Sequence, residues 1–459
     1  MNGVILLVKS LRVRQGTIAA LLVLCAASAR PDSRLQAATP AAPSRDELLA
    51  QAERCERILQ KSLIDFYLPA CVDSENGGYL ESLRDGKFAG TGEKFLTLQA
   101  RQLWFFSTLA AEGYAKEKAL AAAKVGYDFL QGKMLDRTDG GYYSKVTDAG
   151  NPRDTRKHIY LNSFALYGLV GYYRASKNPE ALEAAKRLFQ VLEKRAHDYQ
   201  DGGYNEFFYT DWSLVTDPKE AGYVGAIGHK TYNTHLHLLE SFAELYRVWP
   251  DDLLARRLYD LILINTSTVR SPRVESNVDA YFGDWRVVPE PRNLRASYGH
   301  DVECVWLTRD AVKTVGASPS LVRNWAEGLC KSSIEFGFDR QSGGFFSGGP
   351  LGKAADDMKK VWWVQAEAIV SMIDMFKATS NPEYYDLFAR TLEFIERHQV
   401  AQEGGWWATR SSDGSAAGDQ QRTGPWQAGY HAGRAMMMCA KGLRELANDN
   451  TRWGHEAAK

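Results

Sequence analysis

The stretch Gly77-Gly78-Tyr79 carries the pattern that decides the fold, because a glycine pair followed by an aromatic residue recurs along the chain. The further copies are Gly140-Gly141-Tyr142, Gly202-Gly203-Tyr204, Gly343-Gly344-Phe345 and Gly404-Gly405-Trp406. Successive spacings are 63, 62, 141 and 61 residues, so the long gap is about two periods and predicts a diverged copy near Asp279-Ala280-Tyr281-Phe282. Glycine permits the positive φ of tight turns, so we expect each copy to form a short hairpin loop.

Two helix-like stretches lie between successive glycine loops, and several begin at Asn-Pro or Ser-Pro, as at Asn178-Pro179, Ser318-Pro319 and Asn381-Pro382. A charged, amphipathic set is predicted near 46–67, 116–133, 179–197, 252–267, 319–336 and 381–398. A set richer in Trp, Tyr, His and small residues is predicted near 92–112, 157–175, 230–248, 298–313, 360–377 and 427–446. Six outer and six inner helices predict an all-α fold, an (α/α)6 barrel with the hairpin loops at one mouth. An open superhelical solenoid is the alternative.

The N-terminus has the composition of a signal peptide. Its features are the basic residues Lys9, Arg12 and Arg14, an apolar segment at 17–27 and the cleavage motif Ala27-Ser28-Ala29. The apolar segment is too short to span a bilayer. We therefore predict a signal peptide at 1–29, a flexible leader at 30–44 and a single catalytic barrel at 45–459, in a protein that is periplasmic or secreted.

The composition of the chain limits the classes of molecule that it is expected to bind. The chain has 459 residues, 12% of them aromatic, and a formal net charge of zero. The charge gives no reason to expect nucleic acid or a membrane surface as a partner. The aromatic content is typical of a cleft that stacks on sugar rings, so we expect a small carbohydrate as the substrate. We expect the protein itself to be a monomer or a homodimer. The five cysteines beyond the leader show no CxxC spacing, and whether Cys55 and Cys71 pair stays open.

Each predicted inner helix carries a polar or aromatic side chain suited to a site, amid apolar neighbours. These are Arg101, Tyr160, Asn233, His300, Trp363 with Glu367, and His431. Their spacings of 59, 73, 67, 63 and 68 residues follow the repeat, so they should lie at similar heights around one mouth. Because buried polar groups are costly unless they serve a purpose or are paired, the ring is a candidate site.

Neighbouring positions extend this candidate site. His237 follows Asn233 by four residues and shares its helical face, whereas His235 points elsewhere and is expected to be structural. Glu303 follows His300 by three residues and is expected to orient the imidazole or to bind a hydroxyl. Trp426 precedes His431 and offers a stacking platform.

Metal binding is the alternative use of two His-x-x-Glu pairs, His237–Glu240 and His300–Glu303. Ligands on one helix need further partners, and no recognisable set of them is present in the sequence. We therefore expect neither a metal nor an organic cofactor.

The sequence resembles the N-acylglucosamine 2-epimerase superfamily, and in particular its cellobiose 2-epimerase branch. The motifs that carry the resemblance are Gln99-Ala100-Arg101-Gln102-Leu103-Trp104, Lys157-His158-Ile159-Tyr160, Tyr232-Asn233-Thr234-His235-Leu236-His237-Leu238-Leu239-Glu240, Gly299-His300-Asp301-Val302-Glu303, Lys360-Val361-Trp362-Trp363-Val364-Gln365-Ala366-Glu367, Gly424-Pro425-Trp426 and Tyr430-His431. The resemblance implies an (α/α)6 barrel in which His300 and His431 are the acid/base pair. It further implies that the sugar's oxygens are held by Arg101, Tyr160, Asn233, His237, Glu303 and Glu367, and that the sugar rings stack on Trp363 and Trp426.

The reaction so implied inverts C2 of a reducing-end aldose through ring opening and an enediolate, with histidine moving the proton. The residues leave open a disaccharide of the cellobiose or mannobiose type and a monosaccharide such as N-acylglucosamine or mannose. An aldose–ketose isomerase of the mannose isomerase type shares the enediolate and is the nearest alternative. A glycoside hydrolase would need two facing carboxylates, for which Glu303 and Glu367 qualify, but it leaves three inward histidines unexplained. A non-catalytic carbohydrate-binding protein would explain the aromatic residues only.

Overall fold

The computed structural model describes residues 40–220, 222–271, 273–418 and 420–449, which belong to one compact unit. The predicted signal peptide and the leader as far as residue 39 lie outside the described residues. Within the described part no helix has the length and apolar character needed to cross a membrane. Cys55, Cys71, Cys304, Cys330 and Cys439 are all buried free thiols, so Cys55 and Cys71 are not paired in this structure.

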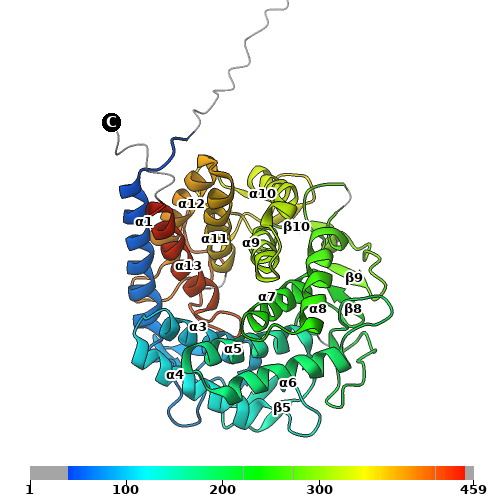
Figure 1. Ribbon diagram of the computed structural model, residues 1–459. Coiled ribbons are helices and arrows are strands. Elements are labelled where there is room, and N and C mark those ends of the chain that lie inside the picture. The colour runs from blue at the N-terminus through cyan, green and yellow to red at the C-terminus, as the bar shows by residue number, and fades with distance from the viewer. Residues whose placement is uncertain (1–39, 221, 272, 419, 450–459) are drawn as a thin grey trace, which may run out of the picture. The chain divides into compact units, whose positions relative to one another are not determined.

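The described chain alternates between helices of two rings, which confirms the predicted all-α (α/α)6 barrel. The inner ring consists of α3 (Leu96–Ala111), α5 (Ile159–Ser176), α7 (Tyr232–Val248), α9 (Tyr298–Thr314), α11 (Trp362–Thr379) and α13 (Tyr430–Ala447). The outer ring consists of α1 (Arg45–Ile58), α4 (Lys116–Phe129), α6 (Pro179–Arg195), α8 (Asp252–Leu263), α10 (Arg323–Gly337) and α12 (Pro382–Phe394). Figure 1 shows the two rings, with the chain's colours passing in order around the centre.

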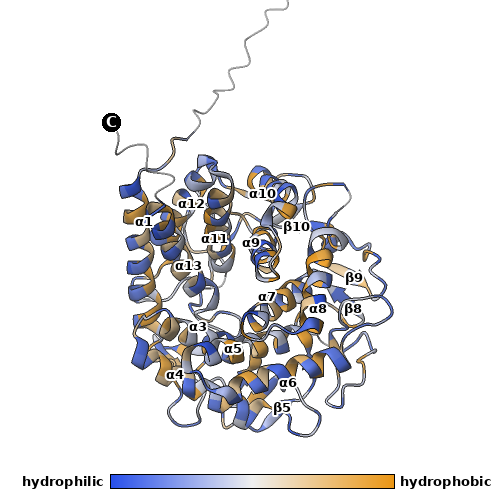
Figure 2. Ribbon diagram, viewed as in Figure 1, coloured by the Kyte–Doolittle hydropathy of each residue, from blue (hydrophilic) through white to orange (hydrophobic). Residues whose placement is uncertain are grey.

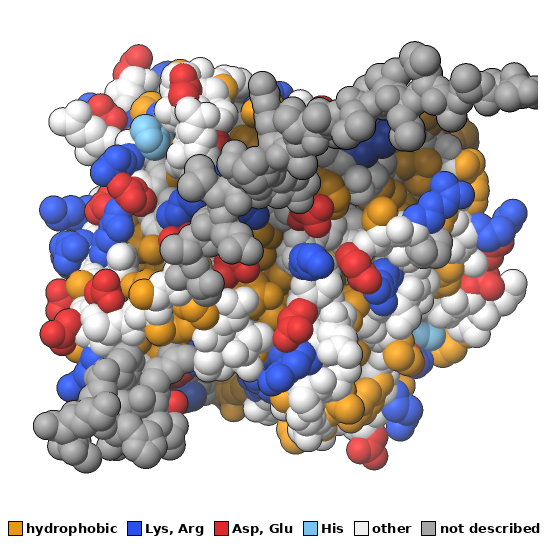
Figure 3. Space-filling model, turned by 90° about the horizontal axis from the view of Figure 1, so that it is seen from above, with side chains coloured by type: hydrophobic (Ala, Val, Ile, Leu, Met, Phe, Trp, Pro, Cys, Tyr) orange, Lys and Arg blue, Asp and Glu red, His pale blue; other side chains and the backbone are white. Residues whose placement is uncertain are grey.

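The outer helices form where the sequence predicts them, because they have one apolar face and defined starts. In α6, Asn178 caps the helix by accepting the N–H of Glu180, and Pro179 occupies the first turn. Its buried residues are mainly alanine and leucine, and charged residues cover the other face, as the mixed colouring of the outer ring in Figure 2 shows. On the face shown in Figure 3, acidic and basic side chains are intermingled, so no large area carries a single sign of charge.

The glycine loops follow the outer helices and are tied to the starts of the inner helices by buried lysine–aspartate pairs. In the second copy, Lys157 Nζ lies 2.7 Å from Asp136 Oδ2, and both side chains are at most 1% exposed. Asp136 also accepts the backbone N–H groups of Thr138 and Asp139, which shapes the turn that leads into the glycine pair. The other pairs of this kind are Lys94–Asp73, Lys230–Asp198 and Lys360–Asp339.

A second repeated contact comes from the fourth residue of the inner helices. Gln99 accepts the backbone N–H of Tyr79 at 2.9 Å, and His235 accepts that of Tyr204 at 3.0 Å. The corresponding pairs elsewhere are Asn162 with Tyr142 and Gln365 with Phe345. These bonds satisfy buried backbone donors that the tight turn cannot pair by itself.

The diverged copy keeps this geometry without its glycines, but its predicted position was wrong. In it the backbone N–H of Ser271 donates to the carbonyl of Ser276, and Asp301, the fourth residue of α9, accepts the N–H of Asn277 at 3.2 Å. The turn therefore lies just before Asn277, whereas the predicted stretch 279–282 contains the following strand. An aromatic pair drew the prediction to the strand, because the turn itself carries no glycine pair.

Short antiparallel strands join successive repeats at the end of the barrel where the inner helices begin. The strands directly before the inner helices are β3 (Glu93–Phe95), β6 (Lys157–His158), β8 (His229–Thr231), β10 (Arg295–Ser297) and β12 (Lys360–Val361). Their partners in the next repeat are β4 (Lys145–Thr147), β7 (Phe207–Phe208), β9 (Ala280–Phe282), β11 (Gly348–Pro350) and β13 (Thr409–Arg410). Three more strands complete the described set: β5 (Pro152–Asp154) lies beside β4, and β1 (Ser82–Arg84) pairs with β2 (Lys87–Ala89). The pairing fixes the starts of the inner helices at one common mouth.

We predict that Lys157→Met lowers the free energy of unfolding by about 3–5 kcal/mol, because it leaves the buried Asp136 carboxylate without a counter-charge. Urea unfolding followed by circular dichroism measures the loss. The matched double variant Asp136→Asn/Lys157→Met removes the charge while an amide oxygen still accepts the turn's N–H groups, so it should recover part of the stability. A single variant within 0.5 kcal/mol of the parent would contradict the assigned role.

Candidate active site

The predicted site residues project from the first two turns of the inner helices, in two layers. The second or third residues of their helices are Tyr160, Asn233, His300, Trp363 and His431. The sixth residues are Arg101, His237, Glu303 and Glu367. An α-helix rises about 1.5 Å per residue, so the second layer, three or four residues later, lies about 4.5–6 Å deeper in the barrel.

A cavity of about 320 Å³ lies between these helix starts, a size suited to a small molecule. Predicted residues on its wall are Arg101, Tyr160, Asn233, His237, His300, Glu303, Trp363, Trp426 and His431. Glu367 does not line it: its side chain is fully buried and faces His431. The structure thus does not place Glu367 against a sugar, and its expected contact with substrate is replaced by a contact with a histidine.

The two predicted acid/base histidines share an aromatic neighbour. The ring centroid of Trp363 lies 4.6 Å from that of His300 and 5.9 Å from that of His431. His431 Nδ1 is hydrogen-bonded to Glu367 Oε1 at 2.6 Å, whereas the His300 ring has no hydrogen-bond partner among the described residues. The two imidazoles therefore face the same cavity, but only the ring of His431 is held by a hydrogen bond.

Glu303 does not orient His300, contrary to one of the two roles expected for it. Its Oε1 atom accepts a hydrogen bond from Arg434 at 3.0 Å, and its Oε2 atom is buried without a partner among the described residues. A buried carboxyl oxygen that lacks a partner beside a cavity is a candidate for contact with a ligand hydroxyl.

Arg101 is held at the cavity wall by two groups. It donates from Nη1 to the carbonyl of Trp426 and from Nη2 to Tyr160 Oη, both at 2.8 Å. Its guanidinium carbon lies 4.1 Å from the centroid of the Phe164 ring, and its buried Nε has no partner among the described residues. A fixed cation with an unused donor can stabilise an oxyanion that develops in the cavity.

Burial sets the charge state of the histidines. It lowers the pKa of His300 to about 3 and that of His431 well below its ordinary value. Both rings are therefore neutral at pH 7. When Glu367 is ionised, it can only accept, so Nδ1 of His431 carries the ring proton and its Nε2 atom holds the lone pair of a base.

Glu303, Glu367 and His431 also have the arrangement of a possible metal site, since one ligand atom from each lies within 4.8 Å of the others. Arg434 Nη2, however, lies 3.0 Å from Glu303 Oε1 and 2.7 Å from Glu367 Oε1. The guanidinium is thus the counter-charge of these carboxylates in this structure. The expectation that the site uses neither a metal nor a cofactor stays a prediction.

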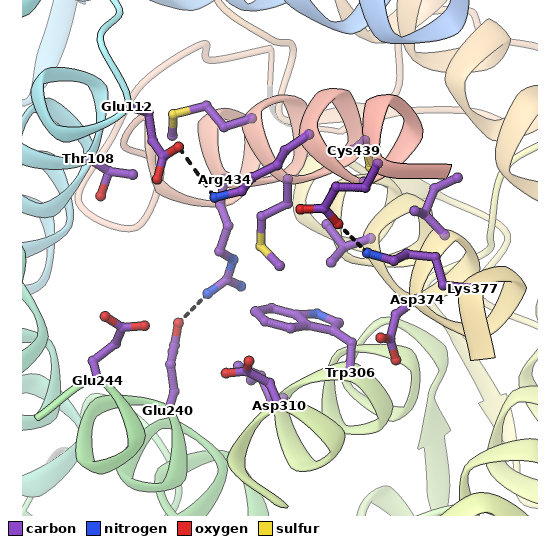
Figure 4. Close-up of a pocket in the computed structure, with 18 of the residues that line it drawn as sticks. Thr108, Glu112, Glu240, Glu244, Trp306, Asp310, Asp374, Lys377, Arg434 and Cys439 are labelled. Atoms are coloured by element: carbon purple, nitrogen blue, oxygen red, sulfur yellow. Dashed lines mark hydrogen bonds and ion pairs between the residues drawn. The ribbon is translucent and has the colours of Figure 1, made fainter. Parts of the chain in front are cut away.

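A second cavity, of about 830 Å³, lies at the opposite end of the inner helices and is shown in Figure 4. Trp306, Glu240 and Arg434 lie on its inner wall. Ion pairs around its rim, which join neighbouring inner helices, include Arg174–Glu244, Arg247–Asp310, Lys313–Asp374, Lys377–Glu445 and Lys441–Glu112. The basic side chains of this rim are therefore paired and do not form a free anion site.

His235 is structural, as predicted, since its Nε2 accepts the N–H of Tyr204 and its Nδ1 lies 2.7 Å from the carbonyl of Thr231. We expect His235→Gln to remain folded and to keep activity within about threefold, because Gln99 and Gln365 occupy the equivalent positions. Steady-state kinetics check this prediction, and a loss of activity above tenfold without unfolding would contradict it.

The same variant should also respond differently to acid. Burial lowers the pKa of His235 to about 3, so between about pH 6.5 and pH 3 the unfolded chain binds a proton that the folded chain does not. Stability that depends on this residue is therefore present above pH 6.5 and falls on acidification. In His235→Gln the slope of unfolding free energy against pH should change by up to about 1.4 kcal/mol per pH unit in this window.

Sequence reasoning missed several residues of the site. Tyr223, Val224 and Trp362 line the cavity, and Tyr223 Oη donates to Asp154 Oδ2 at 2.5 Å. Arg434 lies behind the wall and was not singled out, although it follows His431 by three residues on one helical face. Tyr223 belongs to a loop outside the repeated helices and gave no periodic signal.

The comparisons with known proteins agree with this arrangement. The family model described as N-acylglucosamine 2-epimerase matches residues 77–435. A cellobiose 2-epimerase from Bacteroides fragilis is 33% identical over 87% of this chain and 100% of its own length. The solved structure of cellobiose 2-epimerase from Bacillus thermoamylovorans has a TM-score of 0.78 and 29% identity, covering 85% of this chain and 99% of that one. A D-mannose isomerase structure shares the fold, with a TM-score of 0.74 at 20% identity over 85% of this chain and 97% of that one.

The barrel, its histidine-lined cavity and these relatives define the protein as an isomerase, a carbohydrate epimerase. The chain belongs to the N-acylglucosamine 2-epimerase family.

Proposed function

We propose that the enzyme inverts C2 at the reducing end of a disaccharide of the cellobiose or mannobiose type. The observation that carries the proposal is the placement of His300 and His431 on one 320 Å³ cavity with Trp363 in contact with both rings. Inversion needs proton transfer on both faces of one carbon, and two histidines on separate helices can supply it. The similarity to cellobiose 2-epimerases at about 30% identity supports the substrate class.

The reaction begins with the open-chain aldehyde, whose carbonyl makes the C2 hydrogen acidic. One imidazole removes the C2 proton, the C–H electron pair forms the C1–C2 double bond, and the carbonyl oxygen becomes an enediolate oxyanion. Arg101 is the group placed to stabilise that oxyanion, because its guanidinium is fixed by Tyr160 and Trp426. The negative charge of the oxyanion favours a proton on the other histidine, which takes that proton from solvent and returns it to the opposite face of C2 as the carbonyl re-forms.

The remaining wall residues suit the binding of a sugar. Asn233 Oδ1 is buried without a partner among the described residues and can accept a hydroxyl hydrogen. His237 Nδ1 donates to Glu240 at 2.8 Å, so its Nε2 atom can accept a hydroxyl proton during ring opening. The aromatic faces of Trp363 and Trp426 suit the apolar faces of sugar rings.

Incubation with a panel of sugars tests this proposal, followed by chromatographic identification of the products. Cellobiose, mannobiose, N-acetylglucosamine, glucose and mannose form the panel. Conversion of a disaccharide into its C2 epimer is the expected result. Ketose as the main product would favour the isomerase alternative, and release of monosaccharide from a disaccharide would favour hydrolysis.

Tyr223 provides a test of the disaccharide preference. Its ring lies on the cavity wall and packs against Phe95 of the strand before α3, and we propose that the second sugar ring of a disaccharide contacts it. We expect Tyr223→Ala to raise KM for the disaccharide roughly tenfold, equivalent to ~1.4 kcal/mol, and to change KM for mannose less than threefold. Steady-state kinetics with both sugars measure the difference. Equal changes for the two sugars would contradict the assignment.

We further propose that residues 1–29 are a signal peptide and that the enzyme works in the periplasm or outside the cell. The basic start, the apolar segment and the Ala27-Ser28-Ala29 motif support this. N-terminal sequencing of the exported protein should find residue 30 first. Retention of the intact N-terminus in the cytoplasm would refute export.

A further inference from the structure

Arg434 lies at the centre of a buried charge cluster that the proposed reaction does not use directly. It is the fifth residue of α13, and its side chain is 2% exposed. Its Nη1 atom donates to Glu240 and to Tyr430 Oη, and its Nη2 atom donates to Glu303 and Glu367. One guanidinium thus pairs with carboxylates from three helices, α7, α9 and α11. Figure 4 shows its side chain directed from α13 toward Glu240.

The cluster separates the two cavities of the barrel. Arg434 and Glu240 lie on the wall of the 830 Å³ cavity and not on that of the substrate cavity. His237, Glu303 and His431 lie on the wall of the substrate cavity. Arg434 therefore stands behind the reacting groups and cannot be a catalytic residue in the sense of touching substrate.

Two of its carboxylate partners are also the partners of site histidines. Glu240 Oε2 accepts from Nδ1 of His237 at 2.8 Å, and Glu367 Oε1 accepts from Nδ1 of His431 at 2.6 Å. Only an ionised carboxylate is purely an acceptor, and a protonated one can instead donate to Nδ1 and force the opposite tautomer. The direction of both hydrogen bonds thus depends on the charge of Glu240 and Glu367.

We propose that Arg434 is a positioning residue that keeps Glu240 and Glu367 ionised and thereby holds His237 and His431 in the tautomer whose Nε2 lone pair faces the substrate. This inference rests on the proposed function for its catalytic consequence. Its structural part, the tautomer of the two rings, does not depend on which sugar is the substrate.

The charges around Arg434 agree with this role. The groups that face the cluster are Arg101 from α3, Tyr167 from α5, His237 and Glu240 from α7, Glu303 and Trp306 from α9, Glu367 from α11, and Tyr430 and His431 from α13. Burial raises the pKa of Glu240, but Arg434 and His237 overcome this and lower it to about 2. Burial also raises the pKa of Glu367 above its ordinary value, and Arg434 is the main group that opposes this rise. Burial and the charge of Glu367 raise the pKa of Glu303 well above its ordinary value, so Glu303 holds a proton most readily.

The test compares Arg434→Met with Arg309→Met in the full-length enzyme. Arg309 is a matched control, because it is a buried arginine on inner helix α9 that pairs with Asp374 away from the histidines. For Arg434→Met we expect kcat to fall by roughly 10²-fold with KM within threefold. The acid limb of the kcat–pH profile should move upward by at least about one pH unit, because the carboxylates then hold protons to higher pH. Arg309→Met should leave the profile in place.

A spectroscopic readout separates this role from a general loss of stability. In the enzyme labelled with ¹⁵N-histidine, the His431 ring should show a protonated Nδ1 and an unprotonated Nε2, with the signal assigned from its absence in His431→Ala. Arg434→Met should shift that signal toward the opposite tautomer or the imidazolium form. Arg434→Lys keeps the positive charge but lacks the two Nη donors of the guanidinium, so it should restore part of the parent tautomer population and part of kcat. It replaces the methionine variant if that variant does not fold.

An unchanged ring tautomer together with an unmoved pH profile in a folded Arg434 variant would overturn the proposal. If the parent enzyme epimerises no sugar, the proposed function fails, while the tautomer measurement still decides the role of Arg434.

Discussion

Replacing His431 or His300 with alanine is expected to lower the epimerisation rate by at least roughly 10³-fold, the largest effect of any single change in the site. General acid–base groups contribute about 10²–10⁴-fold each, and inversion requires a proton donor on the face opposite the base. Neither ring can replace the other, because they start from different inner helices, α9 and α13. Initial rates with the preferred disaccharide measure the loss.

Isotope exchange at C2 shows which face of the sugar each histidine serves. With one histidine left, a proton can still be removed and returned on one face, so each variant should exchange the C2 hydrogen of only one of the two epimers with D₂O. The matched control is His235→Gln, which changes a buried histidine outside the cavity and should exchange both epimers. Full turnover in either alanine variant would remove that histidine from the mechanism.

Replacing Glu367 with glutamine is expected to lower kcat roughly 10²-fold while KM changes less than threefold. Glu367 accepts Nδ1–H of His431, Nε1–H of Trp306 and a donor of Arg434, and it does not reach the cavity. A neutral amide removes the charge that favours a proton on Nδ1, and its NH₂ group cannot accept any of these hydrogen bonds. The substrate contacts remain, which is why KM should change little.

The control for this variant is Asp374→Asn on the same helix. Asp374 pairs with Arg309 and Lys313 near the second cavity, so its loss removes a carboxylate from α11 without touching His431. Its kcat should stay within twofold of the parent. A Glu367→Gln enzyme with unchanged kcat would show that the carboxylate does not support the histidine.

The barrel could be predicted because its signals are local and repeated. The glycine pairs mark turns, Asn178 and Asn381 cap outer helices, and the period sets the number of repeats. The diverged turn could not be located because it keeps the shared contact, here between Asp301 and the N–H of Asn277, but carries no glycine pair.

The sequence predicts which residues line the site better than it predicts the contacts between their side chains. The repeat spacing places His300 and His431 at the same mouth, but spacing within a helix cannot show what packs against its far side. The sequence therefore predicts that Glu367 faces the sugar, whereas the structure pairs it with Arg434, 67 residues later in the chain. Arg434 gave little signal, because a single basic residue in an apolar run is also compatible with a surface position.

Deuterium incorporation at C2 tests the central claim most directly. The enzyme is incubated in D₂O with cellobiose and with mannobiose, and proton NMR follows the C2 hydrogen of substrate and product. The proposed mechanism predicts that the new epimer carries deuterium at C2 from the first turnover, because the returning proton comes from a second, solvent-exchanged histidine. A product that keeps the original hydrogen at C2 throughout would contradict the two-histidine account.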